Sequence, residues 1–375
     1  MSTQDHEYMA RAIALAKKGR YTTSPNPNVG CVIVKDGKVV GEGWHEYAGG
    51  PHAEVMALRA AGDNAAGATC YVTLEPCSHY GRTPPCADAL IAAKVGRVVA
   101  AMVDPNPKVS GRGLKRIEAA GIATESGLLT EQAFALNDGF VKRMRGEGPY
   151  IKVKLAATLD GKTALANGKS QWITSPHARK DVQEYRAQSC AIISGADTVI
   201  ADNASLNVRF DELTVAQNVI KLEQVRQPIR VIIDSQCRLT PDLKLFSIES
   251  PVILVRTNES NSEQDSQEQW PDFVEQVIVE TSDDGKVSIK ALVEILAKRN
   301  CNNLWVEAGA TLAGIFVNQG FVDELIVYQA PKLIGAKGLP MLHLEEYEDM
   351  SQLKSLQILD ITRVGPDIRI TAKCE

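Results

Sequence analysis

The chain has 375 residues, more than the roughly 250–300 over which one hydrophobic core grows, so we expect two domains. With 44% hydrophobic and 23% charged residues it has the composition of a globular protein, and a formal net charge of -5 argues against a nucleic-acid partner. No apolar run approaches the about 20 residues of a membrane-spanning helix. We therefore expect a cytoplasmic protein with no membrane partner, whose closely spaced cysteines bind metal or act in catalysis rather than form disulfides.

Strand and helix patterns alternate through the first part of the chain. An amphipathic helix comes first, and strands over 29–34 and 38–43 flank Asp36-Gly37, a dipeptide typical of a hairpin turn. The later helices and strands are expected over 52–61, 69–74, 86–95, 97–104, 115–121 and 131–145. This order predicts a three-layer α/β domain over residues 1–146.

A linker follows at residues 145–150, where the sequence RGEGPY breaks the helical pattern. The α/β pattern then restarts, with a helix over 287–300 for which Ser288 is a suitable N-cap. Strands are expected over 151–158, 190–195, 229–234, 251–256, 275–280, 303–308 and 323–328. Two final strand-like runs around Gly365-Pro366 predict an antiparallel pair, so residues 147–375 should form an α/β domain with a mixed sheet.

The strongest chemical signal joins HAEVMAL at residues 52–58 to PCSHYGRTPPC at residues 76–86. A His-x-Glu pair at a helix start, followed by Pro-Cys and a second cysteine, is the signature of zinc deaminases. We predict that His52, Cys77 and Cys86 bind zinc and leave its fourth position to water, while Glu54 transfers protons. Here eight residues separate the cysteines, instead of the usual two. The simpler interpretation is that His52 caps a helix and the thiols are incidental, but the ordered combination favours the metal site.

A second motif, NLWVEAGATLAG at residues 303–314, reads as a strand, a glycine-containing turn and a helix. Backbone N–H groups at such a turn suit a phosphate or pyrophosphate. No Gly-x-Gly-x-x-Gly sequence follows a strand, so a Rossmann domain is not supported. Taken alone, this motif favours a plain strand-to-helix connection over a phosphate site.

Taken together, TSPNPNVGCVIV, HAEVMAL and LEPCSHYGRTPPCADALI resemble the deaminase half of the bifunctional riboflavin-biosynthesis deaminase-reductases of the bacterial RibD/RibG type. IKVKLAATLDGKTA, SQWITS and VEAGATLAG resemble the reductase half. The resemblance implies a cytidine-deaminase-like domain with one zinc ion, followed by a dihydrofolate-reductase-like α/β domain that uses NADPH. It also implies hydrolytic deamination of 2,5-diamino-6-ribosylamino-4(3H)-pyrimidinone 5′-phosphate, reduction of the ribosyl side chain to ribityl, and a homodimer or tetramer.

The resemblance also assigns binding residues by motif. In the first domain Asn26 resembles the position that contacts the pyrimidine ring, and His45 and His79 are each either a substrate contact or a surface histidine. Substrate-binding residues of the second domain would be Ser170, Arg186, Leu206, Arg209 and Glu307. Cofactor-binding residues would be Ala156, Trp172, Thr198, Asp202, Ser235, Gly309, Ala310, Thr311, Leu312, Ala313, Gly314 and Ile315. Asn26 lies between two prolines and could instead be an ordinary turn residue.

The substrate's 5′-phosphate needs a cation in each domain, because the two sites lie in separate folds. We predict Arg82 in the enlarged cysteine loop for the first domain, and Arg186 or Arg209 for the second. Lys154 and Asp202 are both candidates for the proton donor of the reduction.

Two other functions fit part of this pattern. One is a zinc deaminase of another nucleobase fused to a non-catalytic nucleotide-binding domain; the acidic chain and the enlarged loop argue against a tRNA substrate. The other is a structural zinc module joined to a nucleotide-sensing domain. Glu54 beside three apparent ligands argues against that, because closed structural zinc sites have four ligands.

Overall fold

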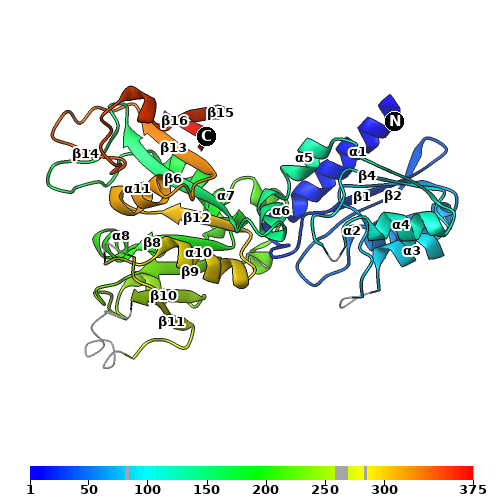
Figure 1. Ribbon diagram of the computed structural model, residues 1–375, viewed down its shortest axis with the longest axis horizontal. Coiled ribbons are helices and arrows are strands. Elements are labelled where there is room, and N and C mark those ends of the chain that lie inside the picture. Colours follow the sequence, from blue (N-terminus) through cyan, green and yellow to red (C-terminus); the bar gives the residue numbers. More distant parts are fainter. Residues whose placement is uncertain (81–83, 108, 258–268, 283–284, 375) are drawn as a thin grey trace. The chain divides into compact units, whose positions relative to one another are not determined.

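The computed structural model describes residues 1–374 except 81–83, 108, 258–268 and 283–284. The chain divides into two compact units, Met1–Gly148 and Pro149–Glu375, and each is described by itself (Figure 1). None of the helices in the described residues has the length and apolarity that crossing a bilayer requires.

The first unit is built on a five-stranded sheet in the order β2-β1-β3-β4-β5. Its strands are β1 (Gly30–Lys35), β2 (Lys38–Trp44), β3 (Thr69–Val72), β4 (Arg97–Ala100) and β5 (Ala123–Ser126). Its helices are α1 (Thr3–Ala16), α2 (Ala53–Ala61), α3 (Cys86–Ala92), α4 (Arg112–Ala119), α5 (Thr130–Phe134) and α6 (Asp138–Met144), with 3₁₀ turns η1 (Lys17–Tyr21) and η2 (Gly62–Ala65). Apolar side chains of α2, α3 and α4 pack on one face of the sheet, and those of α1, α5 and α6 pack on the other. This is the predicted three-layer α/β arrangement.

The predicted hairpin is confirmed, since β1 and β2 pair antiparallel around Asp36-Gly37. The single helix predicted over 131–145 is wrong, because the chain breaks between α5 and α6 at Asn137. The Asn137 side chain accepts from the Asn28 N–H at 2.7 Å and donates to the Asn28 carbonyl at 2.9 Å. These two bonds satisfy the backbone of Asn28 on a distant loop, and they favour the non-helical backbone seen at Asn137.

The second unit is built on a nine-stranded sheet in the order β11-β10-β9-β8-β12-β6-β13-β16-β15. Its strands are β6 (Tyr150–Thr158), β8 (Ala191–Gly195), β9 (Ile229–Ile233), β10 (Val252–Thr257), β11 (Val274–Val279), β12 (Asn303–Glu307), β13 (Glu324–Ala330), β15 (Leu356–Val364) and β16 (Asp367–Cys374). The strands from β11 to β13 run parallel, and β16 and β15 add an antiparallel hairpin at one edge. The predicted mixed sheet and closing pair are confirmed. Two short strands, β7 (Lys162–Ala164) and β14 (Leu339–Pro340), form a separate pair.

Helices cover both faces of this sheet (Figure 1). They are α7 (Pro176–Gln188) and α8 (Ala196–Asp202) on one face, and α10 (Ile289–Lys298) and α11 (Ala310–Asn318) on the other. The 3₁₀ turns are η3 (Phe210–Glu212), η4 (Ala216–Asn218), η5 (Leu222–Gln224), η6 (Lys244–Ser247) and η7 (Met350–Gln352). The hydroxyl of Ser288 accepts from the Ala291 N–H at 3.3 Å, which confirms the predicted N-cap of α10.

One close contact explains a glycine in α11. A Cβ at Gly314 would lie 2.0 Å from the backbone oxygen of His343, so only glycine lets that segment cross the helix. The crossing brings His343 to the N-terminal end of α11, where its Nδ1 lies 3.0 Å from the hydroxyl of Thr311.

Candidate functional site

The predicted zinc ligands of the first unit come together in space. Nδ1 of His52 lies 3.2 Å from Sγ of Cys86 and 3.6 Å from Sγ of Cys77, and the three ligand atoms all lie within 4.8 Å of one another. His52 occupies the N-cap position of α2, but its side chain makes no capping hydrogen bond. The structure therefore favours the metal site over the capping interpretation.

The spacing of these atoms fits zinc. In a tetrahedral site, Zn–N and Zn–S bonds of usual length place nitrogen about 3.6 Å from each sulfur. Cys86 is completely buried, and its backbone N–H donates to Sγ of Cys77 at 3.2 Å. The pKa of Cys77 is lowered to about 4, chiefly because the Cys86 thiol donates a hydrogen bond to it, and the same bond raises the pKa of Cys86. Both effects favour a thiolate at Cys77.

Glu75, which the sequence analysis did not single out, fixes the segment that carries Cys77. Its buried carboxylate accepts hydrogen bonds from the backbone N–H groups of Asp104, Gly111, Gly113 and Leu114, at 2.8 to 3.2 Å. A Cβ at Gly113 would lie only 1.9 Å from the carbonyl oxygen of Pro76. Close packing and a buried carboxylate therefore hold the strand end before Cys77 against the start of α4.

Glu54 lies beside the metal site, on the first turn of α2. Its side chain is only 3% exposed, and burial raises its pKa to about 7 despite its hydrogen bond with Cys86. A carboxyl group with a pKa near neutrality can accept and return a proton at little cost in free energy.

Asn26 and His45 are hydrogen-bonded partners in the structure. Nδ1 of His45 donates to the carbonyl of Pro51 at 3.0 Å, so its Nε2 accepts from the Asn26 amide at 3.1 Å. Burial lowers the pKa of His45, which keeps this neutral form. The rings of His45 and His52 meet edge to face, with centroids 5.5 Å apart. This chain of contacts turns the carbonyl oxygen of the Asn26 amide away from His45.

The cysteine loop carries two further predicted residues, His79 and Arg82. His79 is exposed, with no side-chain hydrogen bond to any described residue. Arg82 lies outside the described residues.

The second unit contains a pocket of about 640 Å³, lined by residues of β6 and β12, of α7 and α8, and of the loops near them. In parallel α/β sheets, ligands bind at the carboxyl ends of the strands. Many predicted residues line it: Ala156, Ser170, Trp172, Arg186, Thr198, Asp202, Leu206, Arg209, Glu307, Gly309, Ala310 and Thr311. The lining does not include Ser235, Leu312, Ala313, Gly314 or Ile315. The side chain of Ala313 is buried in the core.

Glu307 is the centre of a charged network in this pocket. Its carboxylate accepts from Nε and Nη2 of Arg186, at 2.6 and 2.8 Å, and from the indole N–H of Trp305 at 2.7 Å. Burial alone would raise the pKa of Glu307, but Arg186 outweighs it and lowers the pKa to about 2. Arg186 also donates to the carbonyl of Asn207 at 3.0 Å, so its guanidinium is largely engaged inside the protein.

Lys154 stands next to this network, because β6 and β12 pair with Lys154 opposite Glu307. Burial lowers the pKa of Lys154, while the charge of Glu307 raises it and that of Arg186 lowers it. A half-buried lysine that lines a pocket and holds its proton less firmly than usual suits proton transfer.

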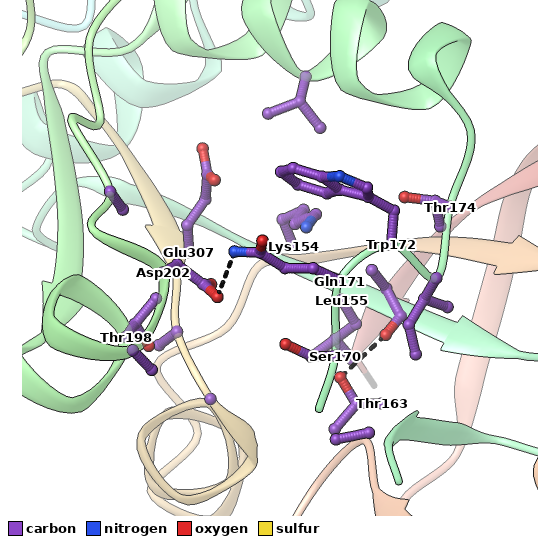
Figure 2. A pocket seen from close by; sticks show the side chains of 18 of the residues that line it. Lys154, Leu155, Thr163, Ser170, Gln171, Trp172, Thr174, Thr198, Asp202 and Glu307 are labelled. Atoms are coloured by element: carbon purple, nitrogen blue, oxygen red, sulfur yellow. Dashed lines mark hydrogen bonds between the residues drawn. The ribbon is translucent and has the colours of Figure 1, made fainter. Parts of the chain in front are cut away.

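Across the pocket, Gln171 donates to Asp202 at 2.9 Å, as Figure 2 shows. Trp172 is 63% exposed and has the guanidinium of Arg179 4.3 Å from its ring centre. Arg209 pairs with Glu212 through two bonds, at 2.7 and 2.8 Å. The sequence did not lead us to select Gln171, Arg179 or Glu212. Gln171 lies within SQWITS, Arg179 follows that motif and Glu212 follows Arg209, and this nearness was the signal that could have suggested them.

Comparison with known proteins shows that each unit matches a protein family. Residues 149–370 match the family described as RibD C-terminal domain, and residues 2–102 match the cytidine and deoxycytidylate deaminase zinc-binding region. The riboflavin biosynthesis protein RibD of Escherichia coli is 53% identical over 366 residues, covering 97% of this chain and 98% of that protein. The Haemophilus influenzae protein of the same name is 51% identical, covering 99% of this chain and 97% of its own length.

Two solved structures are similar to this chain over almost its full length. Acinetobacter baumannii RibD aligns with a TM-score of 0.90 at 45% identity, covering 99% of each chain. A diaminohydroxyphosphoribosylaminopyrimidine deaminase/5-amino-6-(5-phosphoribosylamino)uracil reductase from Thermotoga maritima aligns with a TM-score of 0.85 at 33% identity, also covering 99% of each chain.

Proposed function

The chain belongs to the RibD family of bifunctional riboflavin-biosynthesis enzymes, and on that premise we propose how its residues act on one phosphorylated pyrimidine. Its first unit is a zinc-dependent deaminase and its second an NADPH-dependent reductase. Because the relatives cover both halves of the chain, a deaminase fused to a non-catalytic domain is not favoured. The substrate of the first unit is the diaminopyrimidine ribosyl phosphate, by analogy with the Thermotoga maritima protein.

In the deaminase unit, His52, Cys77 and Cys86 hold the zinc ion. Zinc bound there supplies a water molecule activated for attack near neutral pH. Glu54 takes one proton from that water and passes it to the ring nitrogen as the oxygen adds to the ring carbon. It then takes the remaining proton of the added hydroxyl group and gives it to the departing amine, so the reaction consumes water and releases ammonia. The thiolate ligands require reduced cysteines, which supports a cytoplasmic location.

Asn26 and His45 orient the pyrimidine in this unit. The amide carbonyl of Asn26 accepts from an N–H of the ring, since its NH₂ group is engaged with His45. His79 and Arg82 remain proposed substrate contacts of the cysteine loop, with Arg82 as the phosphate ligand.

In the reductase unit, the pocket holds NADPH and the deaminated substrate together. Trp172, Thr198, Asp202 and the turn at 309–311 contact the cofactor, with Ala156, Ser235 and residues 312–315 as further proposed contacts. NADPH supplies a hydride to C1′ of the sugar. Lys154 supplies the proton, because it lies half-buried beside Glu307 and burial lowers its pKa, whereas the Asp202 carboxylate accepts from Gln171.

The ion pairs that Arg186 and Arg209 form indicate which of these two arginines binds the phosphate in this pocket. Arg186 is paired with Glu307 and lies at the pocket wall with its donors engaged, so it holds Glu307 and the backbone of Asn207, next to Leu206, in place. Arg209 is 41% exposed at its side chain and can exchange Glu212 for a phosphate group. Ser170 and Glu307 contact the sugar hydroxyls.

The observation that carries this proposal is the joint presence of the His-Cys-Cys cluster with Glu54 and the Lys154–Glu307 pocket. The test is to incubate the purified protein with the diaminopyrimidine phosphate and NADPH, and to record ammonia release and NADPH oxidation separately. Ammonia release should not need NADPH, whereas NADPH oxidation should require prior deamination. NADPH oxidation with the undeaminated substrate at an equal rate would contradict the proposed order.

We further propose a homodimer formed through β15. This strand pairs with β16 on one side only within the described residues, and its apolar side chains Leu356, Ile358, Leu359 and Ile361 are 47 to 61% exposed. An unpaired apolar edge favours pairing with another strand. Ile361→Lys should yield a monomer in sedimentation velocity, whereas Ile278→Lys, at the exposed β11 edge of the same sheet, should not. A wild-type monomer at micromolar concentration would contradict the dimer.

A further inference from the structure

The segment 170–174, which contributes Ser170 and Trp172 to the pocket, lacks regular secondary structure. Gln171 and Trp172 lie in a turn, but none of the five residues belongs to a helix or pairs with a strand among the residues that the structure describes. Side chains hold the segment instead: Gln171 bonds to Asp202, and Arg179 donates to the carbonyl of Thr174 at 3.1 Å. Each side-chain contact therefore bears directly on where the indole of Trp172 lies.

Lys332 makes the most direct of these contacts. Its Nζ donates to two successive backbone carbonyls, that of Trp172 at 2.9 Å and that of Ile173 at 2.8 Å. Hydrogen bonds from an ionised donor are stronger than neutral ones, and two acceptors one residue apart fix the peptide plane between them. Lys332 thus determines the direction of the backbone at the point where the tryptophan side chain leaves it.

The lysine itself is fixed by the sheet. It lies two residues after β13, its N–H donates to the carbonyl of Ala330 at 2.8 Å, and its carbonyl accepts from Leu159 at 2.9 Å. β13 is an interior strand between β6 and β16. Lys332 therefore links the irregular segment 170–174 to the end of β13, an interior strand of the sheet.

We propose that Lys332 is a positioning residue for NADPH binding, which acts by holding the indole of Trp172 over the pocket. The guanidinium of Arg179 lies 4.3 Å from the ring centre of Trp172. Trp172 is nevertheless 63% exposed, and it lines the pocket (Figure 2). An aromatic face held in this way can stack on the flat ring of a nicotinamide cofactor. This inference rests on the proposed contact between Trp172 and the cofactor.

The test compares NADPH binding in the full-length protein and its variants by isothermal titration calorimetry. Lys332→Met should raise the Kd for NADPH about tenfold, the effect of losing one charge-assisted interaction. Lys332→Arg should recover most of the affinity, because a guanidinium can also donate to both carbonyls. The matched control is Lys337→Met, which removes an exposed charge from the same loop and should leave the Kd unchanged. Ammonia release should stay at the wild-type rate in all three.

A double-mutant cycle separates the inference from its premise. Trp172→Ala should weaken NADPH binding, and adding Lys332→Met to it should cause little further loss, because the lysine acts through the indole. If Trp172→Ala binds NADPH normally, the cofactor contact itself is wrong, and the inference falls with it. If Trp172→Ala weakens binding while Lys332→Met does not, or if the two losses simply multiply, the positioning role is overturned and the cofactor contact stands.

Discussion

The metal site of the first unit and the pocket of the second are held together in different ways. The metal ligands lie within 34 positions of one another in the chain and are fixed by buried groups, above all the Glu75 carboxylate with its four backbone donors. The pocket collects residues from Lys154 to His343, and several of its links are single side-chain bonds between exposed residues. The first site is therefore rigid before it binds anything, whereas the second can adjust to two ligands. We therefore expect mutations in the first unit to cause large losses of activity, and mutations in the second unit to cause graded changes of activity.

The largest expected effect is that of Glu54→Ala. Losing the proposed proton carrier beside the metal site should lower ammonia release by about a thousandfold or more, within the range of general acid–base catalysis. Zinc content, measured by atomic absorption, should remain near one per chain, because Glu54 is not a ligand. Reduction of the separately supplied deaminated substrate should be unaffected. Loss of zinc together with activity would instead make Glu54 a structural part of the site.

The next effect concerns Lys154 as proton donor. Lys154→Met should lower NADPH oxidation by about a hundredfold at saturating substrate while NADPH still binds. Lys154→Arg keeps the charge but cannot release a proton near neutral pH, so it should remain inactive. An active Lys154→Arg variant would show that only the charge matters and would favour another donor.

The same assignment predicts a pH dependence for the reductase. The donor must be protonated, so kcat should fall as pH rises through the pKa of Lys154, which burial lowers from its ordinary value. Among the groups facing it, Glu307 and Asp202 raise this pKa and Arg186 lowers it. Glu307→Gln removes a raising charge, so the alkaline decline in kcat should move to lower pH. A shift to higher pH would contradict the assignment.

A smaller effect should follow from weakening the support of Cys77. Glu75→Gln keeps the shape of the side chain but replaces one carboxylate oxygen, which accepts two backbone N–H groups, with an amide donor. We expect zinc affinity to fall about 10- to 100-fold, as is usual when groups that orient metal ligands are changed, with the thermal midpoint of the first unit lowered. Competition with a chelator measures the first effect and calorimetry the second. Glu118→Gln, an exposed change on α4, is the control.

Much of the fold was predictable because its hydrophobic patterns are local. The β1–β2 turn, the α10 cap and the closing hairpin each depend on a few neighbouring residues, and each is confirmed. The break at Asn137 was not predictable, because it depends on a bond to Asn28 that is 109 positions away. Long-range side-chain bonds of this kind leave no periodic signal.

The two sites also differ in how far the sequence predicts them. His52, Glu54, Cys77 and Cys86 form a motif whose spacing indicates its chemistry, and the structure brings them together. In the second unit the sequence could propose Arg186 as a phosphate ligand but could not show that Glu307 already occupies it. Lys332 gave no signal at all, because its role depends on a loop 159 and 160 positions earlier in the chain.

The smallest expected effect concerns the phosphate in the reductase pocket, where Arg209 must leave Glu212 to bind it. Arg209→Ala should raise the KM for the deaminated substrate about tenfold, by loss of one charged contact, and leave ammonia release unchanged. Glu212→Gln should act in the opposite direction. Its hydrogen bond with Arg209 lowers the pKa of Glu212, so at neutral pH the carboxylate is ionised and competes with the phosphate for the guanidinium. Removing that charge should lower the KM two- to threefold, an order-of-magnitude figure for a partly exposed ion pair. Steady-state kinetics at fixed saturating NADPH measures both changes. If Glu212→Gln raises the KM as Arg209→Ala does, then the pair acts as a unit that shapes the loop, and the phosphate is bound elsewhere.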